Sequence, residues 1–238
     1  MFTITLIGPD GTGKSTISNM LLDSLPVPKK YIYMGINLDA SNFMLPTTWL
    51  WYKFKRASGK DLDMGGPPDP SRIQPRSKNL LKRIAKEIKS DLRIVNLIAE
   101  EWYRQLIAWY FRAGGYVVIF DRHFYFDYYN HIIADNGTER TIADRVHGLM
   151  LKHLFPKPDY VIFLDAPAEV LFARKGEGTV ELLELRRQEY IQFQDSLEHF
   201  TTVDATQPVD DVARQVTNLV MDFYRLKKAR RGHNANSG

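Results

Sequence analysis

The sequence contains no cysteine, which excludes disulfide bonds, thiolate chemistry and zinc sites built from cysteine. It also lacks any apolar stretch near the roughly 20 residues that cross a bilayer, so any membrane contact would be peripheral. No secretory signal precedes the first strand-like run, and we therefore expect a cytoplasmic protein. The net charge of +4 favours anionic ligands only weakly, and no module for RNA or DNA recognition is visible.

A complete GxxxxGKS motif stands near the N-terminus, between a strand-like apolar run and a segment with a helical pattern. Such a loop wraps backbone N–H groups around phosphate oxygens, while Lys14 adds positive charge and Ser15 offers a hydroxyl to Mg²⁺. A helix that begins near Lys14 also directs its positive dipole end at the loop. We therefore predict a nucleoside triphosphate site formed by Gly8, Asp10, Gly11, Thr12, Gly13, Lys14, Ser15 and Thr16.

Five strand-like runs are separated by longer segments with a helical pattern, and the runs are residues 3–7, 31–34, 116–120, 160–164 and 199–203. This alternation predicts an α/β fold, a three-layer sandwich whose central sheet is mostly parallel. We expect one domain over residues 1–226, with an elaborated loop insertion at 35–78. Residues 77–113 are predicted to form two helices or one long helix, and residues 209–226 an amphipathic helix. Residues 227–238 are predicted to be a basic flexible tail.

Polar residues follow another of these runs, since Asp121, Arg122 and His123 come directly after residues 116–120. Because ligands of parallel sheets gather at the carboxyl ends of the strands, we expect these side chains to face the glycine-rich loop. Asp121 is suited to hold Mg²⁺ or to accept a proton, and the planar guanidinium of Arg122 suits a phosphate. The alternative is a structural ion pair at a strand end.

A further group of basic residues surrounds Gly176 and Gly178, and consists of Arg174, Lys175, Arg186 and Arg187. Positive charge on a mobile segment is what closure over a transferring phosphoryl group requires, so we interpret residues 174–187 as a lid. The alternative is a solvated helix face whose arginines pair with nearby glutamates.

Four patches resemble the thymidylate kinases and their nucleoside monophosphate kinase relatives among the P-loop NTPases: residues 8–16, 115–123, 158–174 and 203–212. The resemblance implies ATP as the phosphoryl donor. It also implies that Asp10 approaches the sugar of the acceptor nucleotide and that Arg122 holds the acceptor phosphate. Arg174 would be the first residue of the lid. In the same way, the loop that follows the last strand-like run would lie against adenine through Ala205, Thr206 and Gln207.

The acceptor side departs from that family. The family carries Arg-Glu-Pro-Gly-Gly where this chain has Met-Gly-Ile-Asn-Leu at 34–38, and Glu100 stands where the family has an arginine, with Arg104 one turn later. His123 and Tyr125 are candidate acceptor contacts, and the aromatic cluster around Tyr125 either stacks on the acceptor or fills the core. The basic and aromatic residues 48–56 either pack on the core, contact a membrane surface or partner, or line a substrate pocket.

These observations predict an ATP- and Mg²⁺-dependent kinase that transfers the γ-phosphoryl group to a small phosphorylated acceptor, with dTMP as the first candidate. The magnesium ligands would be Ser15 and Asp121. The catalytic group would consist of Lys14, Asp10, Asp121, Arg122 and Arg174.

Two other functions stay open at this point. One is a kinase for a hydroxyl of a nucleoside, sugar or lipid-linked acceptor, with Asp10 or Asp121 as the base. The other is an ATP-dependent protein that binds a membrane or a partner through residues 48–56. The sequence also leaves open whether the chain forms a homodimer.

Overall fold

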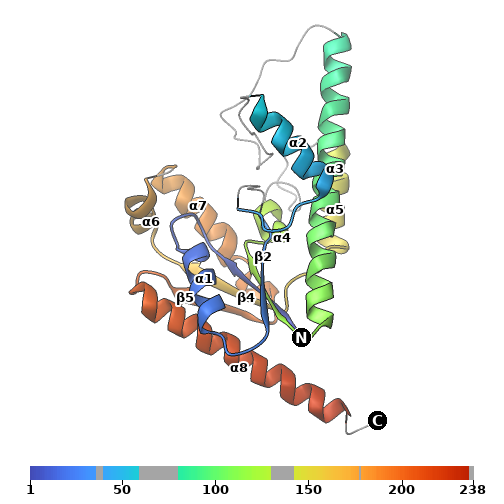
Figure 1. Cartoon of the computed structure of the whole chain (residues 1–238). Coiled ribbons are helices and arrows are strands. Elements are labelled where there is room, and N and C mark those ends of the chain that lie inside the picture. Colours follow the sequence, from blue (N-terminus) through green and yellow to red (C-terminus); the bar gives the residue numbers. More distant parts are fainter. Residues whose placement is uncertain (36–39, 59–79, 130–141, 177, 236–238) are drawn as a thin grey trace.

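One five-stranded sheet forms the centre of the computed structural model, which describes residues 1–35, 40–58, 80–129, 142–176 and 178–235 (Figure 1). The strands lie in the order β2-β3-β1-β4-β5, and every neighbouring pair is parallel. Each strand overlaps the apolar run that predicted it. Their bounds are β1 Thr3–Ile7, β2 Lys29–Tyr33, β3 Val117–Asp121, β4 Tyr160–Asp165 and β5 Phe200–Asp204.

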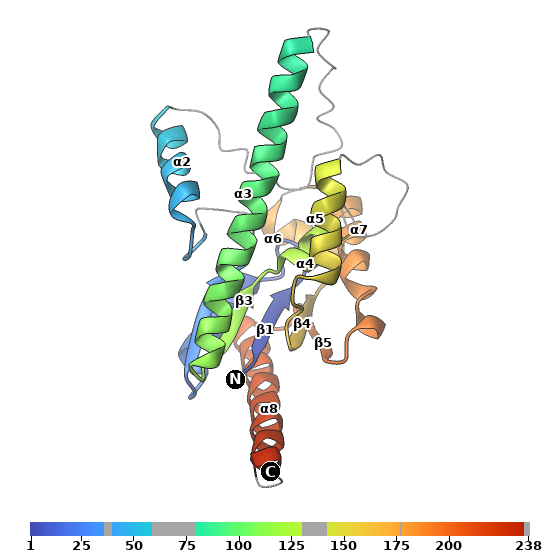
Figure 2. The same cartoon turned by 90° about the vertical axis from the view of Figure 1, so that its right-hand side faces the viewer.

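Helices cover both faces of this sheet, so the predicted three-layer α/β sandwich is confirmed (Figures 1 and 2). Helices α1 and α8 pack on one face, and α3, α4 and α5 contribute to the core on the other. The helices are α1 Lys14–Ser24, α2 Pro46–Ala57, α3 Leu80–Ala113, α4 Phe124–Tyr128, α5 Ile142–His153, α6 Ala168–Lys175, α7 Val180–Ile191 and α8 Val209–Ala235.

Strand β3 shows why the central strands of the sheet are largely apolar. Val117 and Ile119 belong to the core cluster under α1 and α8, whereas Val118 and Phe120 belong to the cluster under α3 and α5. Successive side chains of a strand point to opposite faces, so a strand covered on both faces alternates between two cores. Burying each such side chain contributes about 1.5–3 kcal/mol before entropic costs, which fixes β3 inside the sheet.

Three predictions about the helices are now decided. Helix α3 is a single helix of 34 residues from Leu80 to Ala113. The insertion at 35–78 is not all loop, because Pro46 begins α2; proline is tolerated in the first turn, where its missing N–H has no helical partner to lose. Helix α8 does not end at Leu226 but continues to Ala235, since the Lys, Ala and Arg residues that follow favour helix. Residues 36–39 and 59–78 of the insertion lie outside the described residues.

The parallel strands all end at the same edge of the sheet, and their register brings polar residues together there. Leu6 of β1 and Tyr33 of β2 are the register partners of Asp121 on either side of β3. The glycine-rich loop leaves β1 at this edge and enters α1. Within the described residues, no helix is both long enough and apolar enough to span a membrane.

Candidate phosphate-binding site

The glycine-rich loop has the backbone shape that an anion site requires. Gly8 has a φ of 148°, and a Cβ added there would lie 2.5 Å from the carbonyl oxygen of Leu164, so only glycine fits between β1 and β4. Gly13 is the N-cap of α1 with a φ of 84°, and no side chain caps that helix. The first N–H groups of α1 therefore keep the hydrogen-bonding capacity that phosphate oxygens use.

Lys14 lies folded into this loop. Its Nζ donates hydrogen bonds of 2.7 Å to the carbonyl oxygens of Gly8 and Pro9, and lies 3.8 Å from Oδ1 of Asp10. Burial and, after it, the charge of Arg122 lower the pKa of Lys14 to about 8, while Asp10 opposes the change. A polyphosphate in the loop would replace these weak carbonyl acceptors with anionic ones and restore the ordinary affinity of Lys14 for its proton.

Asp121 ends β3 directly beside the loop, as predicted. Its Oδ2 accepts hydrogen bonds from the hydroxyls of Ser15, at 2.8 Å, and Tyr31, at 2.9 Å. Its Oδ1 is buried and has no hydrogen-bond partner among the described residues. A buried carboxylate oxygen without a partner is costly unless something binds it. This oxygen and the Ser15 hydroxyl fit a hard cation such as Mg²⁺.

The Ser15 hydroxyl and the Asp121 carboxylate fit a cation that binds together with a nucleotide better than a cation that protein ligands hold alone. No group of three or more His, Asp or Glu side chains within the described residues could hold a metal ion. Mg²⁺ keeps several waters and takes one or two protein ligands when it accompanies a nucleotide, so two protein oxygens suffice.

Arg122 crosses from the end of β3 to the loop. Its Nη2 donates a hydrogen bond of 2.6 Å to Oδ1 of Asp10, which joins the two motifs that the sequence predicted to face each other. Its backbone has a φ of 68°, a strained value for a residue other than glycine, and its carbonyl accepts a hydrogen bond from Thr5 Oγ1 at 3.1 Å. Strain of this kind collects at functional sites.

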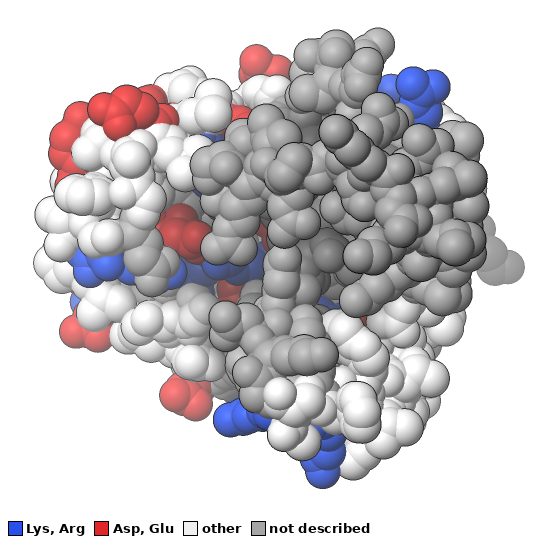
Figure 3. All heavy atoms as spheres, turned by 90° about the horizontal axis from the view of Figure 1, so that it is seen from above, with Lys and Arg blue, Asp and Glu red and all other residues white. Residues whose placement is uncertain are grey.

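Charge in this cluster is balanced between the loop and β3. Burial alone would raise the pKa of Asp10, but Lys14 and Arg122 outweigh it and lower the pKa to about 2. Burial works against the charge on Arg122, yet Asp127 and Asp10 hold its pKa above the ordinary value. Both side chains are therefore charged near neutral pH. Seen from above, basic side chains line a recess beside acidic ones (Figure 3).

His123 and Tyr125 lie behind this cluster, inside the core. The His123 side chain has no exposed surface, and its Nδ1 accepts a hydrogen bond from the N–H of Tyr125 as the N-cap of α4. Burial lowers the pKa of His123 to about 3, so its imidazole is neutral. Tyr125 is 6% exposed and packs against Phe126 and Phe193. Both side chains are buried in this conformation, and the aromatic cluster around Tyr125 fills the core.

Asp127 and Tyr190 are the residues of the site whose part the sequence reasoning missed. The hydroxyl of Tyr190, on α7, donates a hydrogen bond of 3.3 Å to Oδ1 of Asp127 in α4. Burial raises the pKa of Asp127, while Arg122 and Lys14 lower it, which places its carboxyl in the same charged cluster. The available signal was an acidic residue in the first turn after Asp121-Arg122-His123, obscured by the aromatic residues around it.

Arg174 reaches the loop that follows β5. Its Nη1 donates a hydrogen bond of 2.8 Å to the carbonyl oxygen of Ala205. Thr206 is held by Asp204, which accepts hydrogen bonds from its N–H at 2.8 Å and its hydroxyl at 2.6 Å, and Gln207 contacts the same carboxylate. These residues therefore form one connected turn beside α6.

The other basic residues of the predicted lid are partly committed to ion pairs. Arg187 binds Asp165 at the end of β4 through two hydrogen bonds of 2.6 and 2.9 Å, and its Nη1 lies 3.3 Å from Glu184. The N-cap of α6 is Pro167, so Asp165 does not cap that helix. The bidentate pair fastens α7 to the sheet edge.

The side chain of Arg104 makes hydrogen bonds within the protein. Its guanidinium is 1% exposed and donates hydrogen bonds to the carbonyl oxygens of Tyr33, Gly35 and Phe43, and to the carboxylate of Glu100. It thus holds the chain on both sides of residues 36–39, where the family motif is missing. Burial lowers the pKa of Arg104, and Glu100 opposes that change.

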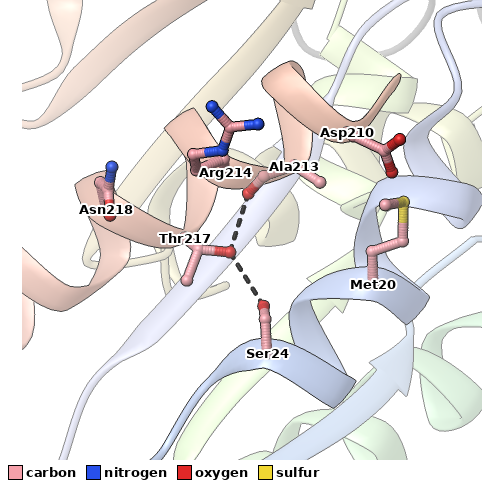
Figure 4. A pocket seen from close by; sticks show the side chains of 7 residues that line it. All are labelled: Met20, Ser24, Asp210, Ala213, Arg214, Thr217 and Asn218. Carbon is pink, nitrogen blue, oxygen red and sulfur yellow. Dashed lines mark hydrogen bonds between the residues drawn. The ribbon is translucent and has the colours of Figure 1, made fainter. Parts of the chain in front are cut away.

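A separate shallow pocket lies between α1 and α8 (Figure 4). Its volume is about 260 Å³, and the hydroxyls of Ser24 and Thr217 within it bond to each other at 2.9 Å. The lining residues are Met20, Ser24, Asp210, Ala213, Arg214, Thr217 and Asn218. None of them belongs to the phosphate-binding cluster.

Comparison with known proteins agrees with this architecture. No protein-family model matches the chain. Over 120 residues, 48% of the chain, it is 29% identical to a probable thymidylate kinase of Archaeoglobus fulgidus, and the match spans 58% of that relative's length. This match confirms the resemblance to the thymidylate kinases over about half of the chain.

Among solved structures, the chain is similar to deoxyadenosine kinase from M. mycoides, determined with dCMP and dCDP bound. The TM-score is 0.50 at 18% identity, over 92% of this chain and 99% of that one. At this identity the likeness concerns the fold, and it confirms the P-loop type of α/β sandwich.

Proposed function

We propose that this chain is an ATP-dependent phosphotransferase that transfers the γ-phosphoryl group to a nucleoside monophosphate, with dTMP the first candidate. The observation that carries the proposal is the hydrogen bond of 2.6 Å between Arg122 and Asp10. It places a phosphate-suited guanidinium against the loop that would hold the donor phosphates, so donor and acceptor would meet at one place. The thymidylate kinase relative supports the same class of reaction.

The described residues supply the parts that phosphoryl transfer needs. Lys14 would leave the carbonyl oxygens of Gly8 and Pro9 for the β- and γ-phosphates, and Arg122 would exchange Asp10 for the acceptor phosphate. An acceptor oxygen then bonds to the γ-phosphorus while the bond to the bridging oxygen breaks, and the electron pair leaves with ADP. Positively charged side chains beside the equatorial oxygens of the transferring phosphoryl group lower the barrier.

Ser15 and Asp121 are the residues that would hold Mg²⁺, which when bound neutralises charge on the donor phosphates. Ala205, Thr206 and Gln207 would form the turn that contacts adenine. Arg174 would lie beside this turn, because it already donates a hydrogen bond to the carbonyl oxygen of Ala205. Residues 174–187 would serve as the lid of a single kinase domain, with Tyr190 reaching the charged cluster through Asp127.

A monophosphate acceptor fits the charges better than a hydroxyl acceptor. A phosphate oxygen is already a nucleophile, whereas a hydroxyl needs a base whose pKa lies nearer the working pH. The pKa of Asp10 is about 2, so this carboxylate is a weak base. A hydroxyl acceptor remains the second candidate because Asp127, a buried carboxyl whose pKa is raised, lies in the same cluster.

The test is a coupled assay of ADP release with dTMP, other nucleoside monophosphates, nucleosides and sugars as acceptors. We expect transfer to at least one monophosphate, and Lys14→Ala should lower kcat/KM on the order of 100-fold or more through the charge lost from the donor phosphates. Lys152→Ala, which removes an exposed lysine on α5, is the matched control. Transfer to nucleosides alone would favour the second candidate, and no transfer to any acceptor would refute both.

A further inference from the structure

Helix α2 presents large apolar side chains to solvent. Trp49 is 47% exposed, Leu50 64%, Trp51 45% and Phe54 77%. The helix rests on α3 by a narrow edge, where Thr48 is buried and its hydroxyl accepts a hydrogen bond of 3.0 Å from Asn96. Figures 1 and 2 show α2 beside the upper part of α3, above the sheet. Packing of these aromatic residues on the core, one reading of the sequence, is therefore wrong.

Basic residues accompany this apolar surface. Lys53 and Arg56 are exposed on α2. The Nζ of Lys53 lies 4.0 Å from the centre of the Trp49 ring, and Nη1 of Arg56 donates a hydrogen bond of 3.2 Å to the hydroxyl of Tyr52. The helix contains three basic residues and no Asp or Glu. Leu50 and Phe54 lie one turn apart and form an apolar stripe along the helix. Lys53 and Arg56 also lie about one turn apart and form a basic stripe beside it.

This combination is typical of a helix that lies in the surface of a membrane. Such helices bury Trp, Phe and Leu among the acyl chains, while Lys and Arg meet anionic headgroups. With 12 residues, α2 is too short to span a bilayer. We propose that α2 docks this chain on an anionic lipid membrane, with Leu50, Trp51 and Phe54 inserted and Lys53 and Arg56 at the headgroups.

Charge argues against a second copy of this chain as the occupant of the α2 surface. In a two-fold symmetric dimer each α2 would face its own copy, and Lys53 would approach basic side chains on a helix that contains no acidic residue. Anionic lipid offsets these charges. The docking surface shares no residue with the phosphate-binding cluster, so the inference is independent of the proposed function.

The experiment is flotation of the full chain with phosphatidylcholine vesicles and with mixed phosphatidylcholine–phosphatidylglycerol vesicles. We expect binding to the mixed vesicles only. Leu50→Glu with Phe54→Glu should weaken it at least about tenfold, since two buried apolar side chains are lost. Lys53→Glu with Arg56→Glu should weaken it at least about tenfold as well and remove its dependence on phosphatidylglycerol.

The matched control is Leu149→Glu with Leu154→Glu, which changes two exposed leucines, 59% and 68% exposed, outside α2. Its binding should equal that of the unaltered chain. Circular dichroism and thermal unfolding verify that every variant is folded. No binding by the folded, unaltered chain, or equal losses in the control and the α2 variants, would overturn the proposal. The proposal would also be overturned if light scattering showed a dimer that Leu50→Glu with Phe54→Glu dissociates, and if the unaltered chain bound no vesicles.

Discussion

The buried guanidinium of Arg104 allows a quantitative test of how the acceptor side is held. The change Arg104→Met keeps much of the side-chain volume and removes the charge. It deletes the hydrogen bonds to the carbonyl oxygens of Tyr33, Gly35 and Phe43, and leaves Glu100, 4% exposed, without its ion-pair partner.

The magnitude follows from the uncompensated charge. Removing one partner of a buried ion pair costs about 3–5 kcal/mol, because the remaining charge stays buried. With an m-value of about 3 kcal/mol per molar urea for a chain of this size, we expect the unfolding midpoint to fall by roughly 1–1.7 M. Glu100→Gln combined with Arg104→Met should recover at least about 1 kcal/mol of the free energy of unfolding relative to additive losses.

The assay is urea unfolding followed by circular dichroism for the two single variants and the double variant. Arg112→Met is the matched control, since Arg112 lies on the same helix with its side chain 41% exposed, and we expect a loss below about 1 kcal/mol. If Arg104→Met unfolds within about 1 kcal/mol of the unaltered chain, or if the two losses simply add, the buried-pair reasoning is refuted.

Three further predictions follow from other contacts. Asp121→Asn should raise the Mg²⁺ concentration needed for transfer by about 10–100-fold; an unchanged Mg²⁺ requirement in kinase assays would contradict the role of its unpartnered oxygen. Asp165→Asn should lower Tm by about 2–4 °C, because the bidentate pair with Arg187 is worth roughly 1 kcal/mol at this partly exposed position; calorimetry showing no decrease would contradict it. The depressed pKa of His123, about 3 against 6.5 when unfolded, stabilises the fold fully above pH 6.5 and progressively less as pH falls toward 3. The free energy of unfolding should therefore fall by about 2 kcal/mol between pH 7 and pH 5, and His123→Asn should remove that dependence.

The sequence predicted the parallel sheet well because the central strands β1, β3 and β4 are largely apolar and buried on both faces. It also predicted the meeting of Asp10 with Arg122, since both follow strands that end at one edge. Buried polar side chains were harder to place. His123 and Tyr125 follow the same strand end, yet the turn into α4 directs both into the core. Chain order alone does not distinguish a side chain that faces a ligand from one that caps the next helix.

Contacts between distant segments account for the rest. Tyr190 lies 63 residues from Asp127, and Arg187 lies 22 residues from Asp165, so no local pattern marks either pair. The exposure of α2 was likewise undecided, because an aromatic helix reads the same whether it packs on a core or lies outside it. Only the position of α2 on α3 distinguishes the two.

The left-handed backbone at Arg122 makes a sharp, fixed turn between β3 and α4. Only Arg122 and His123 separate β3 from α4, one fixed by its φ of 68° and the other by the helix it caps. The direction of the guanidinium is therefore set by the main chain before any ligand arrives, which lowers the entropy lost on binding. Insertion of a single residue at this joint would swing the arginine away from the loop while leaving every side chain of the site in the sequence.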